Sequence, residues 1–283
     1  MKNGLYIVST PIGNLGDITL RATDTLKNSD IIICENPKHS LKLLSKLDIK
    51  KKLISLHDYN EEAVIDKIRE ELKNKKYSLI SDAGSPLISD PGYKLVRFCI
   101  ENNIYVTVVP GASSLTSALQ ISSIPTNKYS FYGFLPKSKQ NIIEFVGLLK
   151  NSNLTSVFFV SRHKILLLLE ILSTELVDRK IAICKEITKM NERVFIGTPQ
   201  EVIKSFKKSK KNSLGEFVIV IEGGDKPKKP LGEIGFEINH IIKKLLEKFS
   251  LTDTVEIVHK IGNIGNIGKK ELYNKALNIK NEK

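Results

Sequence analysis

The sequence predicts an α/β protein with two domains and a small helical tail, and three observations lead to this fold class. The chain has 283 residues, of which 41% are hydrophobic and 27% charged, so its composition is globular and its length exceeds that of one small core. Short apolar runs alternate with segments of helical periodicity, as in sheets covered by helices. Around Pro125 both periodicities stop. We therefore expect domains at residues 1–124 and 125–224, and a helical tail at residues 231–283.

The first domain should contain a parallel sheet. Its expected strands are short, rich in β-branched residues and apolar on both faces, which is typical of strands buried between two helix layers. They lie at residues 4–8, 30–34, 77–81 and 104–109. Apolar residues at helical spacing between them predict two helices, marked by Val64, Ile65, Ile68 and Leu72 and by Leu95, Val96, Cys99 and Ile100.

A second set of strands and helices follows Pro125. The strands are expected at residues 129–134, 154–160, 180–184, 193–196 and 216–221. A helix is expected at residues 165–172, and the domain should close near Gly223. The polar segment at residues 225–230 is typical of a linker, and the tail contains a three-residue repeat, IGNIGNIG, at residues 261–268.

The positive charge of the chain is concentrated in its second part. The net charge is +13. Residues 1–125 hold 16 basic and 14 acidic side chains, whereas residues 126–283 hold 28 and 17, a surplus of +11. Such an asymmetry favours a polyanionic partner. A general preference for lysine is the alternative, since only six of the 44 basic residues are Arg.

Membrane, secretory and disulfide-rich classes are disfavoured. No run approaches the ~20 apolar residues that cross a bilayer, and the apolar run Leu5 to Val8 is too short for a signal peptide. The three cysteines, Cys34, Cys99 and Cys184, form no C-x-x-C pair, so the sequence suggests neither a disulfide framework nor a zinc site. We expect a cytoplasmic protein.

Three loops rich in Gly and Pro follow three expected strands of the first domain, at residues 9–17, 81–92 and 110–114. The carboxyl ends of parallel strands meet at one edge of a sheet, where ligands bind. Gly permits close approach to the main chain and positive φ, and Pro leaves carbonyl groups free to accept hydrogen bonds. None of the loops is a G-x-G-x-x-G or G-x-x-x-x-G-K-[ST] motif, which disfavours nicotinamide cofactors and ATP. The loops therefore predict one ligand cleft of another kind.

Two helix N-termini are expected beside this cleft. Asp90 should cap a helix that begins at Pro91, and Ser113 should cap the helix that begins just after it. A free helix N-terminus suits a carboxylate or phosphate group.

Five segments stand out in order along the chain: LYIVSTPIGNLGDITLRA (5–22), SLISDAGSPLISDPGYKLV (78–96), VVPGASS (108–114), FYGFLPK (131–137) and KEITK (185–189). They resemble the tetrapyrrole methylase superfamily, and more narrowly its bacterial branch that 2′-O-methylates a cytidine in the decoding region of 16S rRNA. A sixth segment, KKELYNKAL (269–277), is similar to the terminal helical piece of that branch.

The resemblance implies a homodimer in which S-adenosylmethionine lies in a cleft between two α/β domains. Ser85 stands where the corrin and sirohaem enzymes of the superfamily usually have Asp. The implied cofactor-binding residues come from the three loops and from one position of the second domain. They are Pro11, Ile12, Gly13, Asp82, Ala83, Gly84, Ser85, Pro86, Leu87, Ile88, Pro110, Gly111, Ser113 and Phe134.

Methyl transfer to a ribose hydroxyl needs an in-line approach at ~3 to 3.5 Å and a group that accepts the hydroxyl proton. The polar segment after the second strand offers Glu35, Lys38 and His39 as catalytic residues, with Glu35 as base or ribose anchor and Lys38 as a phosphate ligand. Asp17, at the end of the first loop, is another option. An ordinary role for Glu35 in a helix cap or salt bridge is the alternative. The family usually has Glu-Asp-Thr-Arg here, so this chain lacks one carboxylate and one guanidinium. The transfer requires no metal, and no metal is expected.

The implied partner is 16S rRNA or the small ribosomal subunit. The expected RNA contacts are Lys38, His163, Lys189, Lys269 and Lys270. His163 matches the family, whereas Lys164 stands for an Arg and Val160 for an acidic residue. A structural role for His163, and an ion pair of Lys189 with Glu186, are the alternatives. The lysine-rich stretch at residues 204–211 could hold the phosphate backbone.

Two other functions stay open on the sequence. The same fold could methylate a carbon of a tetrapyrrole, in which case the basic second part of the chain would have no role. The altered segment after Glu35 could instead mark a non-catalytic RNA-binding descendant.

Overall fold

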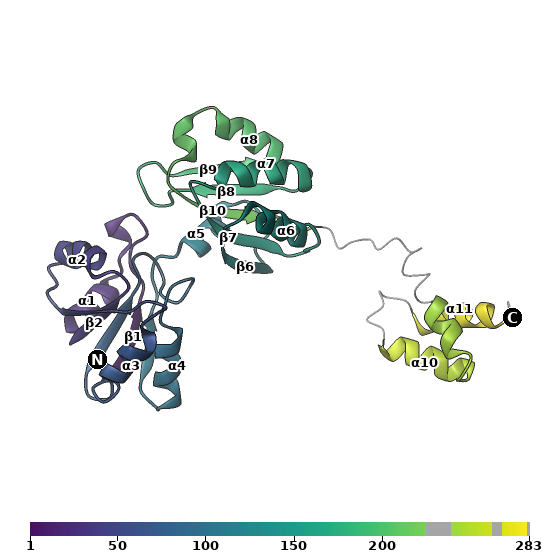
Figure 1. Ribbon diagram of the computed structural model, residues 1–283, viewed down its shortest axis with the longest axis horizontal. Coiled ribbons are helices and arrows are strands. Elements are labelled where there is room, and N and C mark those ends of the chain that lie inside the picture. Colours follow the sequence, from purple (N-terminus) through teal and green to yellow (C-terminus); the bar gives the residue numbers. More distant parts are fainter. Residues whose placement is uncertain (225–238, 262–267, 282–283) are drawn as a thin grey trace. The chain divides into compact units, whose positions relative to one another are not determined.

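The computed structural model describes residues 1–224, 239–261 and 268–281. It divides into two compact units, Met1–Gly224 and Asp225–Lys283 (Figure 1). The linker expected at residues 225–230 and all but the two end residues of the repeat at 261–268 lie outside the described residues.

The first sheet is entirely parallel, as expected, and has the order β3-β2-β4-β1-β5. The sequence indicates four of its strands and misses β3, which is only four residues long and partly exposed. The prediction that the strands are buried on both faces is wrong in part for β5, because β5 is an edge strand paired only with β1 and Val108 is 56% exposed. The strands are β1 Gly4–Val8, β2 Ile31–Cys34, β3 Lys52–Ser55, β4 Lys76–Ile80 and β5 Val106–Val109.

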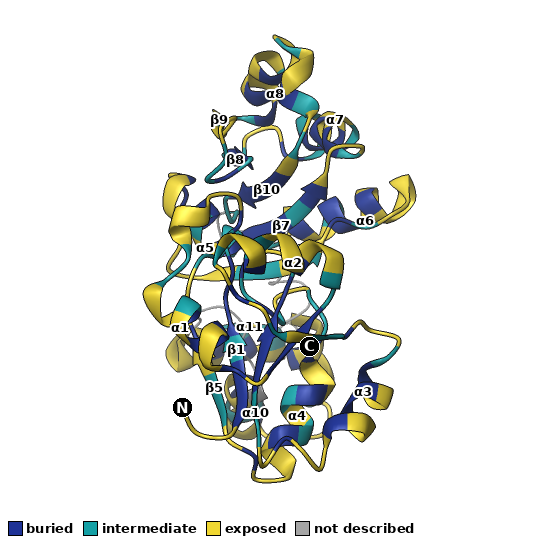
Figure 2. Cartoon of the chain, turned by 90° about the vertical axis from the view of Figure 1, so that its left-hand side faces the viewer, coloured by how far each residue is buried: buried dark blue, intermediate teal, exposed yellow. Residues whose placement is uncertain are grey.

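Helices cover both faces of this sheet, because successive apolar residues of each strand point to opposite sides. Ile31 and Ile33 of β2 pack in one cluster with α3 and α4, while Ile32 and Cys34 pack in another with α1 and α2. In Figure 2 strand β1 is dark blue and the outer sides of the helices are yellow. The helical elements are η1 Leu15–Asp17, α1 Leu20–Asn28, α2 Pro37–Lys46, α3 Glu61–Ile68, α4 Tyr93–Glu101 and α5 Ser114–Ile121.

The second sheet is mixed and has the order β6-β7-β10-β8-β9. Only β6 and β7 run parallel to each other, and the other pairs are antiparallel. All five strands lie within a residue of their expected bounds. They are β6 Tyr129–Phe134, β7 Thr155–Ser161, β8 Ile181–Lys185, β9 Arg193–Gly197 and β10 Glu216–Ile221.

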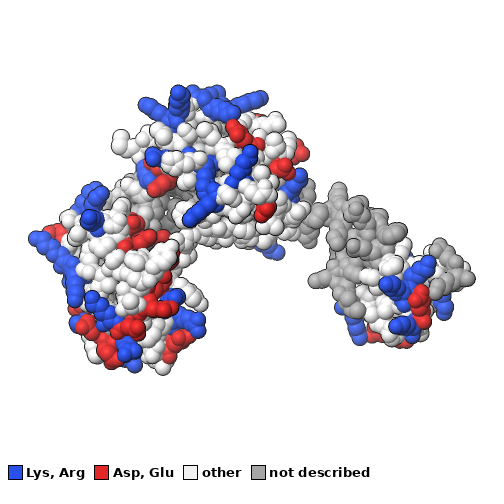
Figure 3. Space-filling model, in the orientation of Figure 1, with Lys and Arg blue, Asp and Glu red and all other residues white. Residues whose placement is uncertain are grey.

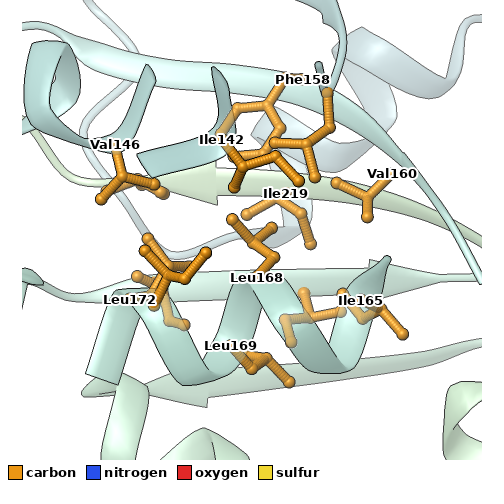
Figure 4. Close-up of a cluster of buried hydrophobic side chains, with 14 of the residues drawn as sticks. Ile142, Val146, Phe158, Val160, Ile165, Leu168, Leu169, Leu172 and Ile219 are labelled. Atoms are coloured by element: carbon orange, nitrogen blue, oxygen red, sulfur yellow. The ribbon is translucent and has the colours of Figure 1, made fainter. Parts of the chain in front are cut away.

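Helices also cover both faces of the second sheet. On one face, Ile165, Leu168 and Leu172 of α7 pack with Phe158 and Ile219 (Figure 4). On the other face lies α5, which the sequence assigns to the first domain but which packs on β10 and β7. The remaining elements of this half are α6 Lys139–Lys150, α7 Ile165–Glu175, α8 Pro199–Lys207 and η2 Lys210–Ser213. The domain boundary expected at residue 124 stays a prediction.

The tail is helical, as expected. Helices α10 Leu251–Ile261 and α11 Lys269–Asn281 pack together through a small apolar core. That core contains Ile242, Val255, Val258, Leu272 and Ala276. None of the described helices has the length and the apolar character that crossing a membrane requires.

The start of α4 differs from the expectation. The helix begins at Tyr93 with Gly92 as its N-cap, so Asp90 does not cap it. Instead, the buried Glu61 carboxylate accepts hydrogen bonds from the amides of Gly92 and Lys94, at 3.0 and 2.9 Å. Ser113 does occupy the N-cap position of α5, but its side chain makes no capping hydrogen bond.

Candidate functional site

The three loops rich in Gly and Pro come together at the carboxyl edge of the first sheet. The Thr10 amide donates to the Gly84 carbonyl at 2.8 Å, and the Gly84 amide donates to the Thr10 carbonyl at 3.1 Å. The Ser85 hydroxyl lies 3.1 Å from that of Ser9 and donates to the Ala112 carbonyl at 3.2 Å. One tight assembly of main chain therefore joins the loops after β1, β4 and β5.

The loop at residues 81–92 has an unusual backbone. Gly84 has a φ of 81°, and two residues with side chains, Leu87 and Ser89, have φ values of 73° and 70°. Side chains disfavour this left-handed region, and such conformations cluster at binding sites, where the surrounding structure maintains them. A Cβ on Gly84 would lie 3.1 Å from the Ile12 side chain, so the close approach of these loops also requires glycine.

This loop forms one wall of a cleft of about 330 Å³ between the two halves of the first unit. The lining residues from the first half are Asp82, Ala83, Gly84, Ser85, Ile88, Ser89, Asp90, Ser113 and Ser114. Those from the second half are Phe134, Phe159, Val160, Ser161, Glu216 and Phe217. A smaller hollow of about 90 Å³ shares Ala83, Ser114, Glu216 and Phe217 with the cleft and extends to Ile12 and Lys189.

The structure brings eight of the fourteen predicted cofactor residues to these two hollows. They are Ile12, Asp82, Ala83, Gly84, Ser85, Ile88, Ser113 and Phe134. The other six line neither hollow. They are Pro11, Gly13, Pro86, Leu87, Pro110 and Gly111.

The residues expected at the cleft from the sequence do not include Asp90, Glu216, Phe159 or Phe217, which also line it. Phe159 and Phe217 lie within apolar strands, where nothing in the sequence separates a residue facing a cleft from one facing the core. Asp90 is a polar residue of a Gly/Pro loop, a signal that could have marked it.

Glu35, Asp82 and Asp90 lie near one another at the edge of the first sheet. Burial raises the pKa of the Asp90 carboxyl to about 6; the charges of Glu35 and Asp82 add to this, and the Ser81 hydroxyl opposes it. Burial also raises the pKa of Glu35, with contributions from Asp82 and Asp58. One oxygen of Asp82, Oδ1, is buried without a hydrogen-bond partner.

The predicted catalytic residues Glu35, Lys38 and His39 do not line the cleft. Asn36, not Glu35, caps α2 by accepting hydrogen bonds from the Lys38 and His39 amides. The Lys38 and His39 side chains are exposed on the first turn of α2. Catalytic roles for these three residues stay predictions.

Lys189 is held in the wall of the smaller hollow by two ion pairs. Its ammonium lies 3.0 Å from a Glu186 oxygen and 2.8 Å from a Glu216 oxygen. The aliphatic part of Lys189 packs over Gly13, where any Cβ would clash with it. The loop after β1 thereby contacts the loop after β8, and the ion pair expected as the alternative role of Lys189 is present.

The other expected RNA contacts lie elsewhere. His163 is exposed after β7, and its Nε2 accepts a hydrogen bond from Arg162 at 3.2 Å. Lys269 and Lys270 are exposed at the start of α11, in the second compact unit. Figure 3 shows basic side chains crowded over α8, whereas basic and acidic side chains alternate over the first half. The exposed lysines there are Lys204, Lys207, Lys208, Lys210 and Lys211.

Three further features bear on the site. A wider hollow of about 620 Å³ lies beside the edge strand β5, between Tyr6, Arg21 and Tyr105, and includes none of the glycine-rich loops. Among the residues that the structure describes, no group of three His, Cys, Asp or Glu side chains could hold a metal ion. The three cysteines are free and buried.

Comparison with known proteins identifies the family. Residues 4–203 match the family described as Tetrapyrrole (Corrin/Porphyrin) Methylases. A Rickettsia prowazekii protein named Ribosomal RNA small subunit methyltransferase I is 44% identical over 79% of this chain and 79% of its own length. Proteins of the same name from Thermotoga maritima and Buchnera aphidicola subsp. Schizaphis graminum are 43% and 39% identical, over 77% and 99% of this chain and 98% of their own lengths in both cases.

Solved structures share the fold at low sequence identity. The uroporphyrin-III-C-methyltransferase of Thermus thermophilus aligns with a TM-score of 0.52 and 17% identity over 82% of this chain and 98% of its own. A cobalt precorrin-4 methyltransferase aligns with a TM-score of 0.55 and 14% identity over 77% and 94%. Together with the paired α/β halves and the loops between them, these similarities show that the chain belongs to the tetrapyrrole methylase family.

Proposed function

We propose that the chain transfers a methyl group from S-adenosylmethionine to the 2′-hydroxyl of a cytidine in the decoding region of 16S rRNA. The cleft between the two halves carries this proposal, because two of the three main-chain loops line it together with aromatic residues, and the loop after β1 is hydrogen-bonded to them. The relatives named Ribosomal RNA small subunit methyltransferase I support the choice of RNA as acceptor.

The residues of the cleft fit S-adenosylmethionine. When bound, this cofactor supplies an electrophilic methyl group on a positively charged sulfonium. The charged side chains that line the cleft are Asp82, Asp90 and Glu216, and carboxylates attract a cation. Phe134 and Phe159 add aromatic rings to the lining, and aromatic rings also attract cations. The positive φ of Gly84 allows the tight pairing with Thr10 that shapes this wall of the cleft.

The RNA would contact the basic surfaces of the second half and the tail. Exposed lysines on α8 and η2 can neutralise phosphates, and Lys269 and Lys270 can do the same on the tail. Lys38 and His163 would reach the nucleotides that flank the target. Their role is to hold and orient the strand, since a phosphate contact carries no sequence information.

A tetrapyrrole acceptor has weaker support. It rests on the corrin and porphyrin enzymes among the solved structures. Their sequences are 14–17% identical to this chain, which supports a common fold but not a common substrate. The proposed enzyme acts in the cytoplasm, where ribosomal subunits are assembled, and as a homodimer. Light scattering of the purified protein tests the dimer.

The experiment that tests the function uses the purified chain, S-adenosylmethionine labelled in its methyl group, and small ribosomal subunits that lack the modification. We expect label in a 2′-O-methylcytidine of the decoding region after nuclease digestion. Label on a base carbon, or on another nucleotide, would refute the assignment of the acceptor. Absence of label from both naked RNA and assembled subunits, with cofactor and RNA still bound in calorimetry, would instead indicate a non-catalytic RNA-binding protein.

A further inference from the structure

We propose that Asp90 is the catalytic residue that accepts the proton of the acceptor hydroxyl, an inference that rests on the proposed function. Asp90 lines the cleft between the two halves, whereas Glu35, the base expected from the sequence, does not. The loop that carries Asp90 is the same one that forms the cofactor wall, so the carboxylate and the bound methyl group would share one hollow.

The other titratable groups of the cleft are less suited to this task. Three carboxylates line it, on Asp82, Asp90 and Glu216, and its lining contains no Lys, Arg or His side chain among the described residues. The Glu216 carboxylate lies 2.8 Å from the Lys189 ammonium and is already engaged in an ion pair. The Oδ1 atom of Asp82 is buried and inaccessible. Asp90 is not in an ion pair with any described Lys or Arg.

The surroundings of Asp90 make it a stronger base than an exposed carboxylate. Glu35 and Asp82 face it from the loops after β2 and β4, and Glu216 faces the same hollow from β10. Burial and the two nearer negative charges raise the pKa of Asp90 to about 6, with Ser81 acting in the opposite direction. A base with a pKa near the working pH is both deprotonated and able to take a proton.

The reaction balances without any further reagent. The ribose 2′-oxygen forms a bond to the methyl carbon while the carbon–sulfur bond breaks, and that electron pair stays on the sulfur of the departing S-adenosylhomocysteine. The hydroxyl proton moves to Asp90, which returns it to water after product release. A carboxylate held in this way typically contributes a factor of ~10² to 10⁴ in rate.

Single-turnover methylation of small subunits by the full-length chain tests the proposal, with Asp90→Asn compared against Glu35→Gln and Asp66→Asn. Asp66 is an exposed residue of α3, 75% accessible, and its variant serves as the unchanged control. We expect Asp90→Asn to lose a factor of ~10² or more in rate, while its calorimetric affinity for S-adenosylmethionine falls by less than about tenfold because Asp82 and Glu216 still line the cleft. Asp90→Glu should recover part of the loss.

The pH dependence separates Asp90 from Glu35. The wild-type rate should rise with pH through a midpoint of about 6, because the base must be deprotonated. Glu35→Gln removes a neighbouring negative charge, so its midpoint should move to lower pH while the plateau stays within tenfold of wild type. Full activity of Asp90→Asn would overturn the proposal. Loss of activity in Glu35→Gln alone would also overturn it, as would a loss of cofactor affinity in Asp90→Asn as large as its loss of rate. An inactive wild-type chain would refute the proposed function itself.

Discussion

The Glu61 carboxylate, on the first turn of α3, accepts a hydrogen bond from the Gly92 amide at 3.0 Å. Gly92 joins the loop at residues 81–92 to α4 and has a φ of 122°. The Lys94 and Leu95 amides donate to the same carboxylate, at 2.9 and 3.3 Å. Glu61, thirty-one positions before Gly92 in the chain, therefore accepts the hydrogen bonds of the free amides at the N-terminus of α4. It also fixes one end of the loop that lines the cleft.

Replacement of Glu61 by Ala should lower the free energy of unfolding by about 1–3 kcal/mol, because it leaves buried amides without a partner. Urea unfolding measures this loss. Glu62 is the matched control: it lies next in sequence, and its ion pair with Lys94 is exposed. Glu62→Ala should leave the unfolding midpoint nearly unchanged. Equal effects of the two variants would show that the cap at Glu61 does not stabilise the fold.

Replacement of Gly84 by Ala should weaken S-adenosylmethionine binding by at least about tenfold. The position has a φ of 81°, and its Cβ would lie 3.1 Å from Ile12, so the loop must shift. Titration calorimetry measures the affinity. Gly147→Ala, in α6, is the control: a Cβ there meets nothing within 4 Å. That variant should bind normally and gain roughly 0.5–1 kcal/mol of stability. Normal binding by Gly84→Ala would separate this loop from the cofactor.

Gly13 and Lys189 should show energetic coupling. A Cβ on Gly13 clashes with the Lys189 side chain and would lie 2.9 Å from the Thr188 hydroxyl. Gly13→Ala should therefore reduce stability, and Lys189→Ala should restore part of it, with a coupling energy of about 0.5–3 kcal/mol. Unfolding of both single variants and the double variant measures the cycle. Additive effects would mean that the two loops do not press against each other.

Charge reversal on α8 and the segment after it should weaken RNA binding. Lys207, Lys208 and Lys210 are exposed there, and each lysine that contacts a phosphate contributes roughly 0.7 to 0.9 to the salt dependence of the logarithm of the affinity. The triple change to Glu should therefore lower the affinity and flatten its dependence on salt. The matched control reverses Lys50, Lys67 and Lys73, which are exposed in the first half. Equal losses in both variants would indicate a general effect of net charge.

Asp90→Asn should change how stability depends on pH. Because the folded-state pKa of Asp90 is raised from 3.8 to about 6, the folded protein binds this proton more tightly than the unfolded chain does. Ionisation of Asp90 therefore lowers the free energy of unfolding as pH rises between about 4 and 6. This loss of stability is complete above that range. Asp90→Asn should unfold at higher urea than wild type at pH 8, and this difference should disappear at pH 4. A destabilised variant at pH 8 would assign Asp90 a structural role.

The meeting of the three loops at one edge of the sheet is predictable from the sequence because its signals are local. Gly and Pro mark the three loops, and the parallel strands before them bring their carboxyl ends to one edge. The partners of those loops are not local. Nothing near Asp90 indicates that Glu61 caps the next helix, and nothing within β7 or β10 indicates that Phe159 and the buried Phe217 reach the lining of the cleft. Strand β3 was missed for a different reason: only two of its four residues, Leu53 and Ile54, are apolar, whereas all four residues of β2 are.

The proposed cofactor site is formed by the main chain of residues 82–88, and a crystal structure of the protein with S-adenosylhomocysteine is its sharpest test. We expect the nucleoside in the cleft of about 330 Å³, against Gly84 and Ser85 on one side and Phe134 on the other. Density for the ligand in the hollow beside β5, with the cleft vacant at saturating concentration, would contradict it.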